Sequence, residues 1–149
     1  MENLLTAIVL WLSANFGLPA SFDFPRIEMR PPREIVALRY RGLASAQQPG
    51  VPPSGPSSAE ILAIYDDAAR TIYLPENWRG RSPAELSILV HEMVHHLQNV
   101  GSLKFECPQA REQVAYQAQE KWLGLFGRDL ARDFELDPLS VFVKTRCLL

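Results

Sequence analysis

Residues 82–100 read SPAELSILVHEMVHHLQNV, and this stretch decides the fold because it combines the best-marked helix start with all three histidines of the chain. Ser82 and, three residues later, Glu85 form a capping box, and proline at the first helical position favours the same start. Gly101 ends the apolar run, so we expect a helix over about residues 83–100. Most of its positions are apolar, which predicts a helix that is buried nearly all round.

The pattern His-Glu-x-x-His lies in the middle of this predicted helix, at His91, Glu92 and His95. Residues four apart lie one above the other on a helix, so the two imidazoles can bind one metal ion. Glu92 projects about 100° around the helix, where it can accept a proton from water at the open metal position. Such polar groups on an apolar helix need a partner, and a metal ion supplies one. A hydrogen-bonded pair of core histidines is the alternative.

A third protein ligand is expected, because a catalytic zinc site takes three protein ligands and one water. The metzincin extension requires a glycine and then a third histidine after the pattern. The chain has Gln98 and Gly101 at those positions, so the metzincin class is excluded.

A glutamate near the next helix, predicted over about residues 108–126, is the other source of a third ligand. Glu112 is favoured, because it begins the stripe of residues on the inward face of that helix. Glu120 lies on a stripe typical of a solvent-facing surface, and Glu106 precedes the helix. A surface carboxylate that complements the helix dipole is the alternative interpretation of Glu112.

The run HEMVHH at 91–96, together with Glu112-x-x-Ala-Tyr116, resembles the gluzincin branch of the zincin metallopeptidases. The chain is also similar to small bacterial zincin-like proteins of unknown activity, whose hairpin before the active-site helix resembles residues 65–74. The resemblance covers about residues 60–126. It implies one Zn2+ per chain on the two histidines and Glu112, and hydrolysis of a peptide or protein substrate with the glutamate of the pattern as general base.

One position departs from this resemblance. Related peptidases carry an aspartate that orients a histidine ligand where this chain has Tyr116, so a tyrosine hydroxyl or a residue elsewhere has to orient it. An oxyanion donor is also expected, and Tyr65, Tyr73 and Tyr116 are unranked candidates. His96 points about 100° away from His95, so we expect it to support the site indirectly or to lie at the surface.

Zinc-dependent hydrolysis of a peptide bond is the leading function, and two others stay open. The first is a non-enzymatic binding module that keeps a zincin scaffold with a structural metal, because 149 residues leave little room for substrate-binding walls. The second is a zinc amidohydrolase that acts on a non-peptide substrate. A screen of peptides and small amides separates the three.

The expected fold is α+β in a single domain over residues 1–149, with a small antiparallel sheet packed against the active-site helix, the third-ligand helix and flanking helices. Four prolines and two glycines in residues 44–58 predict a surface loop. The other expected elements are a helix over 3–16, an extended segment around 26–29, a short helix after Pro31, a hairpin of 61–65 and 71–74, and a last helix over about 138–147.

Composition and charge exclude several other classes of protein. The formal net charge is -2 at pH 7 and the basic residues are scattered, so no nucleic-acid partner is expected. The apolar residues 4–12 follow no Lys or Arg and fall far short of the ~20 apolar residues of a membrane span. We expect a first core helix there, and a signal peptide removed further upstream stays compatible with it.

The two cysteines, Cys107 and Cys147, favour one disulfide. The first lies just before a predicted helix and the second near the chain end, where a bridge restrains the terminus. On a chain-entropy model, closing a loop of this length stabilises the fold by roughly 4 kcal/mol. Two buried free thiols are the alternative. The disulfide favours an exported protein, periplasmic or secreted, while a cytoplasmic location stays open.

Overall fold

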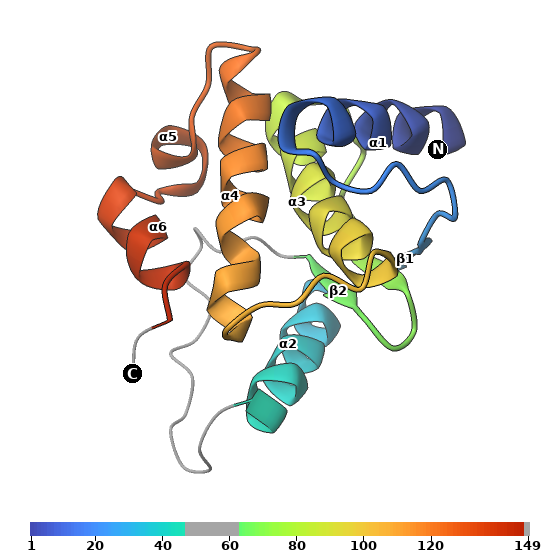
Figure 1. Ribbon diagram of the computed structural model, residues 1–149, viewed down its shortest axis with the longest axis vertical. Coiled ribbons are helices and arrows are strands. Elements are labelled where there is room, and N and C mark those ends of the chain that lie inside the picture. Colours follow the sequence, from blue (N-terminus) through green and yellow to red (C-terminus); the bar gives the residue numbers. More distant parts are fainter. Residues whose placement is uncertain (47–62, 148–149) are drawn as a thin grey trace.

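The computed structural model describes residues 1–46 and 63–147, and the fold is α+β, as the sequence predicted (Figure 1). The elements in chain order are α1 (Glu2–Phe16), β1 (Arg26–Arg30), α2 (Pro32–Ala46), β2 (Ile64–Asp66), β3 (Thr71–Pro75), α3 (Pro83–Val100), α4 (Pro108–Gly124), α5 (Leu130–Phe134) and α6 (Pro138–Lys144). Helix α3 contacts α1, α4 and β2, and therefore lies at the centre of the fold. Helix α1 crosses one end of α3, and α5 and α6 lie on the outer side of α4 (Figure 1).

The sheet has the strand order β1-β3-β2, with β3 in the middle. Strand β2 pairs with β3 antiparallel, as the predicted hairpin requires, but β1 pairs with β3 parallel. The expectation of a wholly antiparallel sheet is therefore wrong. Parallel strands need a long crossover, and the chain between β1 and β3 contains α2. The sequence marked the extended segments, but it did not fix the direction in which they pair.

Helix α3 begins and packs as its sequence predicted. The Ser82 hydroxyl accepts a hydrogen bond from the Glu85 backbone N–H at 3.1 Å, and the Glu85 carboxylate accepts from the backbone N–H groups of Arg79 and Gly80. The Trp78 indole N–H donates to the Glu85 carbonyl at 2.8 Å, which fixes the preceding loop against the helix start. From residue 89 to residue 98 every side chain is buried. The turns that carry His91 and His95 are thus buried on every face.

Glu85→Gln is expected to lower the free energy of unfolding by about 1 kcal/mol at neutral pH, because charged acceptors make stronger hydrogen bonds than amides. The backbone N–H of Arg79 is the main reason why the pKa of Glu85 lies below its usual 4.5, with smaller effects of Gly80 and Ser82. Stabilisation by a carboxylate with a lowered pKa is complete above the unfolded value and is lost as the pH falls through the folded value.

Urea denaturation of Glu85→Gln and wild type at neutral pH, and again well below pH 4.5, measures this difference. Glu76→Gln is the control, since the exposed Glu76 side chain makes no hydrogen bond or ion pair with any residue of 1–46 or 63–147. A stability difference that is the same at both pH values would contradict the assigned role of the carboxylate.

Several element boundaries differ from the sequence expectation. Helix α2 extends to Ala46 and so takes the first three residues of the predicted loop 44–58, because alanine favours helix continuation. The rest of that loop, like the first part of the predicted strand 61–65, lies outside the described residues. Helix α6 ends at Lys144, short of the expected 147. Helix α5 was not predicted, since five residues are too few to show a helical period.

The N-terminal segment is part of the core. Leu5, Ile8, Val9 and Leu12 of α1 are buried, at the spacing expected for one helical face. In residues 1–46 and 63–147, none of the helices combines the length and the apolar character that a membrane crossing requires.

Candidate metal centre

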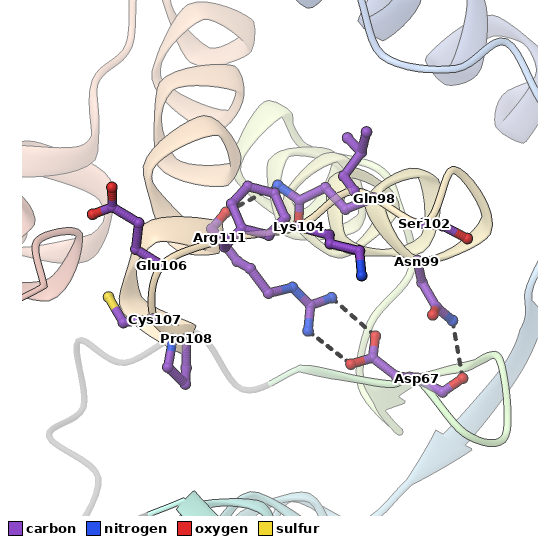
Figure 2. A pocket seen from close by; sticks show the side chains of 11 residues that line it. Asp67, Gln98, Asn99, Ser102, Lys104, Glu106, Cys107, Pro108 and Arg111 are labelled. Carbon is purple, nitrogen blue, oxygen red and sulfur yellow. Dashed lines mark hydrogen bonds and ion pairs between the residues drawn. The ribbon is translucent and has the colours of Figure 1, made fainter.

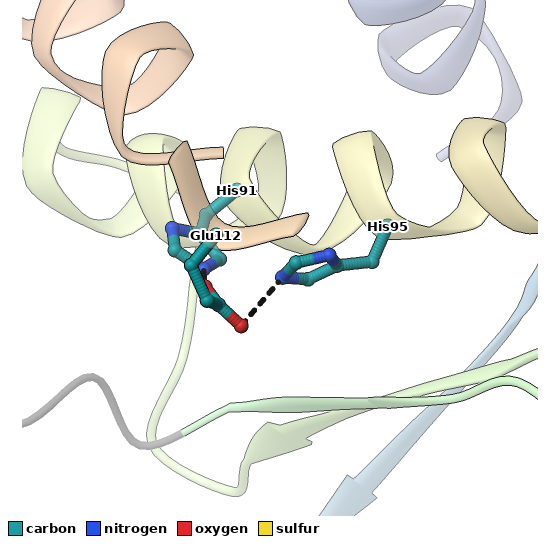
Figure 3. A group of neighbouring side chains, drawn as sticks. All are labelled: His91, His95 and Glu112. Carbon is teal, nitrogen blue, oxygen red and sulfur yellow. Dashed lines mark hydrogen bonds and ion pairs between the residues drawn. The ribbon is translucent and has the colours of Figure 1, made fainter. Parts of the chain in front are cut away.

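Two neighbouring helices bring His91, His95 and Glu112 together (Figure 3). The histidines lie on successive turns of α3, and Glu112 lies on the second turn of α4, which packs along α3. His91 Nε2 is 3.0 Å from one carboxylate oxygen of Glu112, and His95 Nε2 is 3.2 Å from the other. The donor atoms of His91, His95 and Glu112 all lie within 4.8 Å of one another, so the three side chains could hold a metal ion. Among the His, Cys, Asp and Glu residues of the described part of the chain, this group has that arrangement.

The distances from the two histidines to the Glu112 carboxylate are close to those between neighbouring donor atoms of a zinc site. Zinc binds histidine nitrogen and carboxylate oxygen at about 2.0–2.2 Å with tetrahedral geometry, which places neighbouring donor atoms about 3.3 Å apart. His91 Nε2 lies 3.0 Å from one Glu112 oxygen and His95 Nε2 lies 3.2 Å from the other, and the three donor atoms all lie within 4.8 Å of one another. Two imidazoles and one carboxylate are also a donor set of catalytic zinc sites. The residues present therefore fit the metal.

Strong electrostatic coupling joins the three side chains. Burial alone would lower the pKa of His95, but the charge and hydrogen bond of Glu112 outweigh it and raise the pKa of His95 to about 9. Burial likewise opposes the charged form of Glu112, and the two histidines hold the pKa of this carboxyl well below its usual range. Without a metal, Glu112 thus favours the protonated form of His95.

Two buried glutamines contact the far side of the imidazole rings. Gln119 of α4 places its Oε1 atom 3.0 Å from His91 Nδ1, and Gln98 of α3 places its Oε1 atom 3.0 Å from His95 Nδ1. Sequence reasoning missed both. The available signal was the position of Gln119 two helical turns after Glu112 on the same inward face of α4.

Glu92 lines a cavity of about 260 Å³ together with His91, His95 and Glu112. The cavity is also lined by β2 residues Ile64 and Tyr65 and by Arg111 of α4. The Glu92 side chain is 4% exposed, and no described residue makes a hydrogen bond or an ion pair with its carboxylate. The Glu92 oxygens are not among the fully buried, unpartnered polar atoms of the described residues, so they are open to the cavity beside His91, His95 and Glu112.

A second cavity, of about 600 Å³, adjoins this one and shares Pro108 and Arg111 with it (Figure 2). Arg111 binds Asp67 through two nitrogens, at 2.7 and 2.9 Å, and Asn99 donates to the Asp67 carbonyl at 2.9 Å. These contacts fix the Arg111 side chain between the two cavities. They also connect the β2–β3 turn to the first turn of α4.

The tyrosines considered as oxyanion donors lie in different places. The Tyr116 ring packs edge-on against His91, with ring centroids 4.7 Å apart. Tyr65 lines the cavity, but its hydroxyl is 2.9 Å from His96 Nδ1 and accepts from Asn99 at 2.9 Å. Tyr73 is not among the cavity-lining residues, and its ring lies under the Arg30 guanidinium.

His96 is buried rather than at the surface, and it does not contact the metal-binding cluster directly. Its Nε2 atom lies 2.7 Å from the Asp23 carbonyl, and its Nδ1 atom contacts Tyr65. Burial lowers the pKa of His96. A neutral His96 therefore donates a hydrogen bond from Nε2 to the Asp23 carbonyl and accepts one at Nδ1 from the Tyr65 hydroxyl, so the Tyr65 hydroxyl is engaged in a structural hydrogen bond.

The other two glutamates weighed as ligands lie away from the cluster. Glu106 lines the second cavity, and Glu120 accepts a hydrogen bond from the Leu130 backbone N–H at 3.1 Å. Cys107 precedes α4 and forms a disulfide with Cys147, with Cα atoms 5.8 Å apart. This bond fixes the chain end to the start of the helix that carries Glu112.

No curated protein and no solved structure matches the chain. One family model, described as a domain of unknown function (DUF6647), matches residues 1–149, and the chain therefore belongs to the DUF6647 family.

Proposed function

We propose that this protein is a zinc-dependent peptidase whose metal is held by His91, His95 and Glu112. The observation that carries the proposal is the carboxylate of Glu92, which is open to the same cavity as His91, His95 and Glu112 and has no hydrogen-bonding partner among the described residues. A general base has to be free to receive a proton, and a carboxylate engaged in a structural bond is not. Zinc, when bound, would activate a water and polarise the carbonyl of the substrate.

Glu92 performs the proton transfers in this proposal. Its carboxylate takes a proton from the water that attacks the carbonyl carbon, and it then passes that proton to the nitrogen of the departing amine. This role is supported by the position of Glu92 directly after His91 on α3, at the cavity that His91, His95 and Glu112 also line.

A peptide is favoured over a small amide because a sheet edge borders the cavity. Strand β2 is an outer strand of the three-stranded sheet, and its residues Ile64 and Tyr65 line the cavity. An extended peptide can pair its backbone with such an edge strand. The Cys107–Cys147 disulfide supports an exported location, periplasmic or secreted, since disulfides persist in oxidising compartments.

The purified protein is expected to bind one zinc per chain, and a chelator is expected to remove it. Metal analysis after zinc loading at neutral pH, followed by a screen of peptides and small amides, tests both parts of the proposal. Cleavage of peptides that stops with the chelator and returns with zinc supports it. Protein that stays free of zinc after loading contradicts the metal site, whereas bound zinc without turnover favours a binding module. Turnover of small amides alone favours an amidohydrolase.

A further inference from the structure

We infer that Gln119 and Gln98 are positioning residues that keep a hydrogen on Nδ1 of both His91 and His95, so that both Nε2 atoms face the metal position. The inference rests on the proposed zinc site, but it concerns how the chain prepares that site before any metal arrives. A histidine can bind a metal through either nitrogen, and the hydrogen bond made by the other nitrogen decides which one is available.

The orientation of the Gln119 amide follows from a chain of hydrogen bonds that runs through Ser87 to the Ala84 carbonyl oxygen, which can only accept. The Ser87 hydroxyl donates to the Ala84 carbonyl at 2.7 Å, which uses its single hydrogen. The Ser87 oxygen therefore accepts from the side-chain N–H of Gln119, at 3.2 Å. The carbonyl end of Gln119 must then face His91 Nδ1, at 3.0 Å, and this nitrogen must donate.

A separate chain of hydrogen bonds orients Gln98. Its amide nitrogen donates to the Arg111 backbone carbonyl at 3.1 Å, which has no hydrogen to give (Figure 2). Its carbonyl oxygen therefore faces His95 Nδ1, at 3.0 Å, and again the ring nitrogen must donate. Arg111 is itself fixed by its two contacts to Asp67, so the accepting carbonyl sits at a well-anchored helix start.

Burial makes both arrangements hard to reverse. Gln98 is 1% exposed and Gln119 is 0% exposed, so water does not replace a partner lost by flipping an amide. Turning either amide would bring two donors or two acceptors together, and an unsatisfied buried polar group costs roughly 1–3 kcal/mol. The two Nε2 atoms are left toward Glu112, in the orientation that Figure 3 shows.

His96 supplies an internal comparison with the opposite arrangement. Its Nε2 atom faces the Asp23 carbonyl at 2.7 Å, so the hydrogen must be on Nε2, and Nδ1 accepts from Tyr65. The ring hydrogen that a neighbour requires is therefore on Nδ1 in His91 and His95 but on Nε2 in His96, although all three lie on one helix. All three histidines have the same helical backbone conformation in α3, so the difference comes from the side chains and carbonyl groups around each ring.

Nitrogen-15 NMR of the metal-free wild-type protein at neutral pH tests the hydrogen placement directly. We expect a covalently attached hydrogen on Nδ1 of both His91 and His95, whether or not their Nε2 atoms carry one as well. For His96 we expect the hydrogen on Nε2 and none on Nδ1. A ligand histidine without a hydrogen on Nδ1 would overturn the inference. This measurement needs neither zinc nor activity, so its result is separate from that of the proposed function.

Variants at Gln119 then test the effect on metal affinity. Gln119→Met, which removes the acceptor at similar size, is expected to weaken zinc binding by about 10- to 100-fold. Gln119→Glu, which keeps an acceptor for His91 Nδ1, is expected to retain affinity to within about tenfold and to keep the Nδ1 hydrogen. Gln117→Met, at an exposed position on the same helix, is the control.

Competition with a chelator measures these affinities, and NMR of each variant shows whether it is folded and where the hydrogen lies. Equal zinc affinity of folded Gln119→Met and wild type would overturn the inference while leaving the proposed zinc site intact. Gln98→Met provides the same test at His95 through an independent set of bonds.

Discussion

Glu92→Gln is expected to lower kcat for peptide hydrolysis by about 10²- to 10⁴-fold while leaving the zinc content at one per chain. Glutamine has nearly the size and shape of glutamate, so the packing at this 4% exposed position is retained. An amide cannot accept and return a proton at neutral pH, so the transfer to the departing amine is lost. The substrate for this measurement is the peptide that the wild-type protein cleaves fastest in the screen.

Glu106→Gln is the matched control for Glu92→Gln, because Glu106 is exposed and lines the neighbouring cavity rather than the metal cavity. We expect its kcat to equal that of wild type. If Glu92→Gln loses zinc, Glu92 is a metal ligand and the roles assigned above are wrong. If Glu92→Gln keeps both zinc and wild-type turnover, another group is the general base.

Glu112→Ala is expected to weaken zinc binding by more than about 100-fold. Mutating a residue that only hydrogen-bonds to a metal ligand already lowers metal affinity by roughly 10–100-fold, and Glu112 is proposed as a ligand itself. The variant removes the donor that lies 3.0 and 3.2 Å from the two histidine nitrogens and leaves only His91 and His95. It also removes the negative charge that raises the pKa of His95, so the remaining pair attracts a cation less strongly.

Glu106→Ala and Glu120→Ala are the controls for this loss, and zinc titration against a competing chelator is the measurement. Neither control residue belongs to the cluster, so their zinc affinities are expected to stay within a few-fold of wild type. If Glu106→Ala is the one variant that loses zinc affinity, Glu106 and not Glu112 is the third ligand. If none of the three variants changes the zinc affinity, the proposal that a glutamate is the third zinc ligand is wrong, even with both histidines in place on α3.

The sequence located the central helix and its chemistry because both depend on local geometry. The capping box at Ser82 and Glu85 and the apolar run that follows define α3 within a single segment. The spacing of His91 and His95 places both imidazoles on one face of any helix that contains them. Glu112 could be ranked above Glu106 and Glu120 for the same reason, since its face of α4 is visible in the sequence period.

Contacts between distant segments were not accessible in this way. The parallel pairing of β1 with β3, the contact of Gln119 with His91, and the bond between Tyr65 and His96 each join residues whose relative placement depends on how whole elements pack. A period of 3.6 or 2 residues shows which face of an element is buried, but not which neighbour covers it. Thus the sequence by itself located the helix that carries His91 and His95 and favoured Glu112 on the next helix as their partner. Only the tertiary structure decided which histidine nitrogens face Glu112, because that depends on side chains that meet across the packed interface of α3, α4 and the sheet.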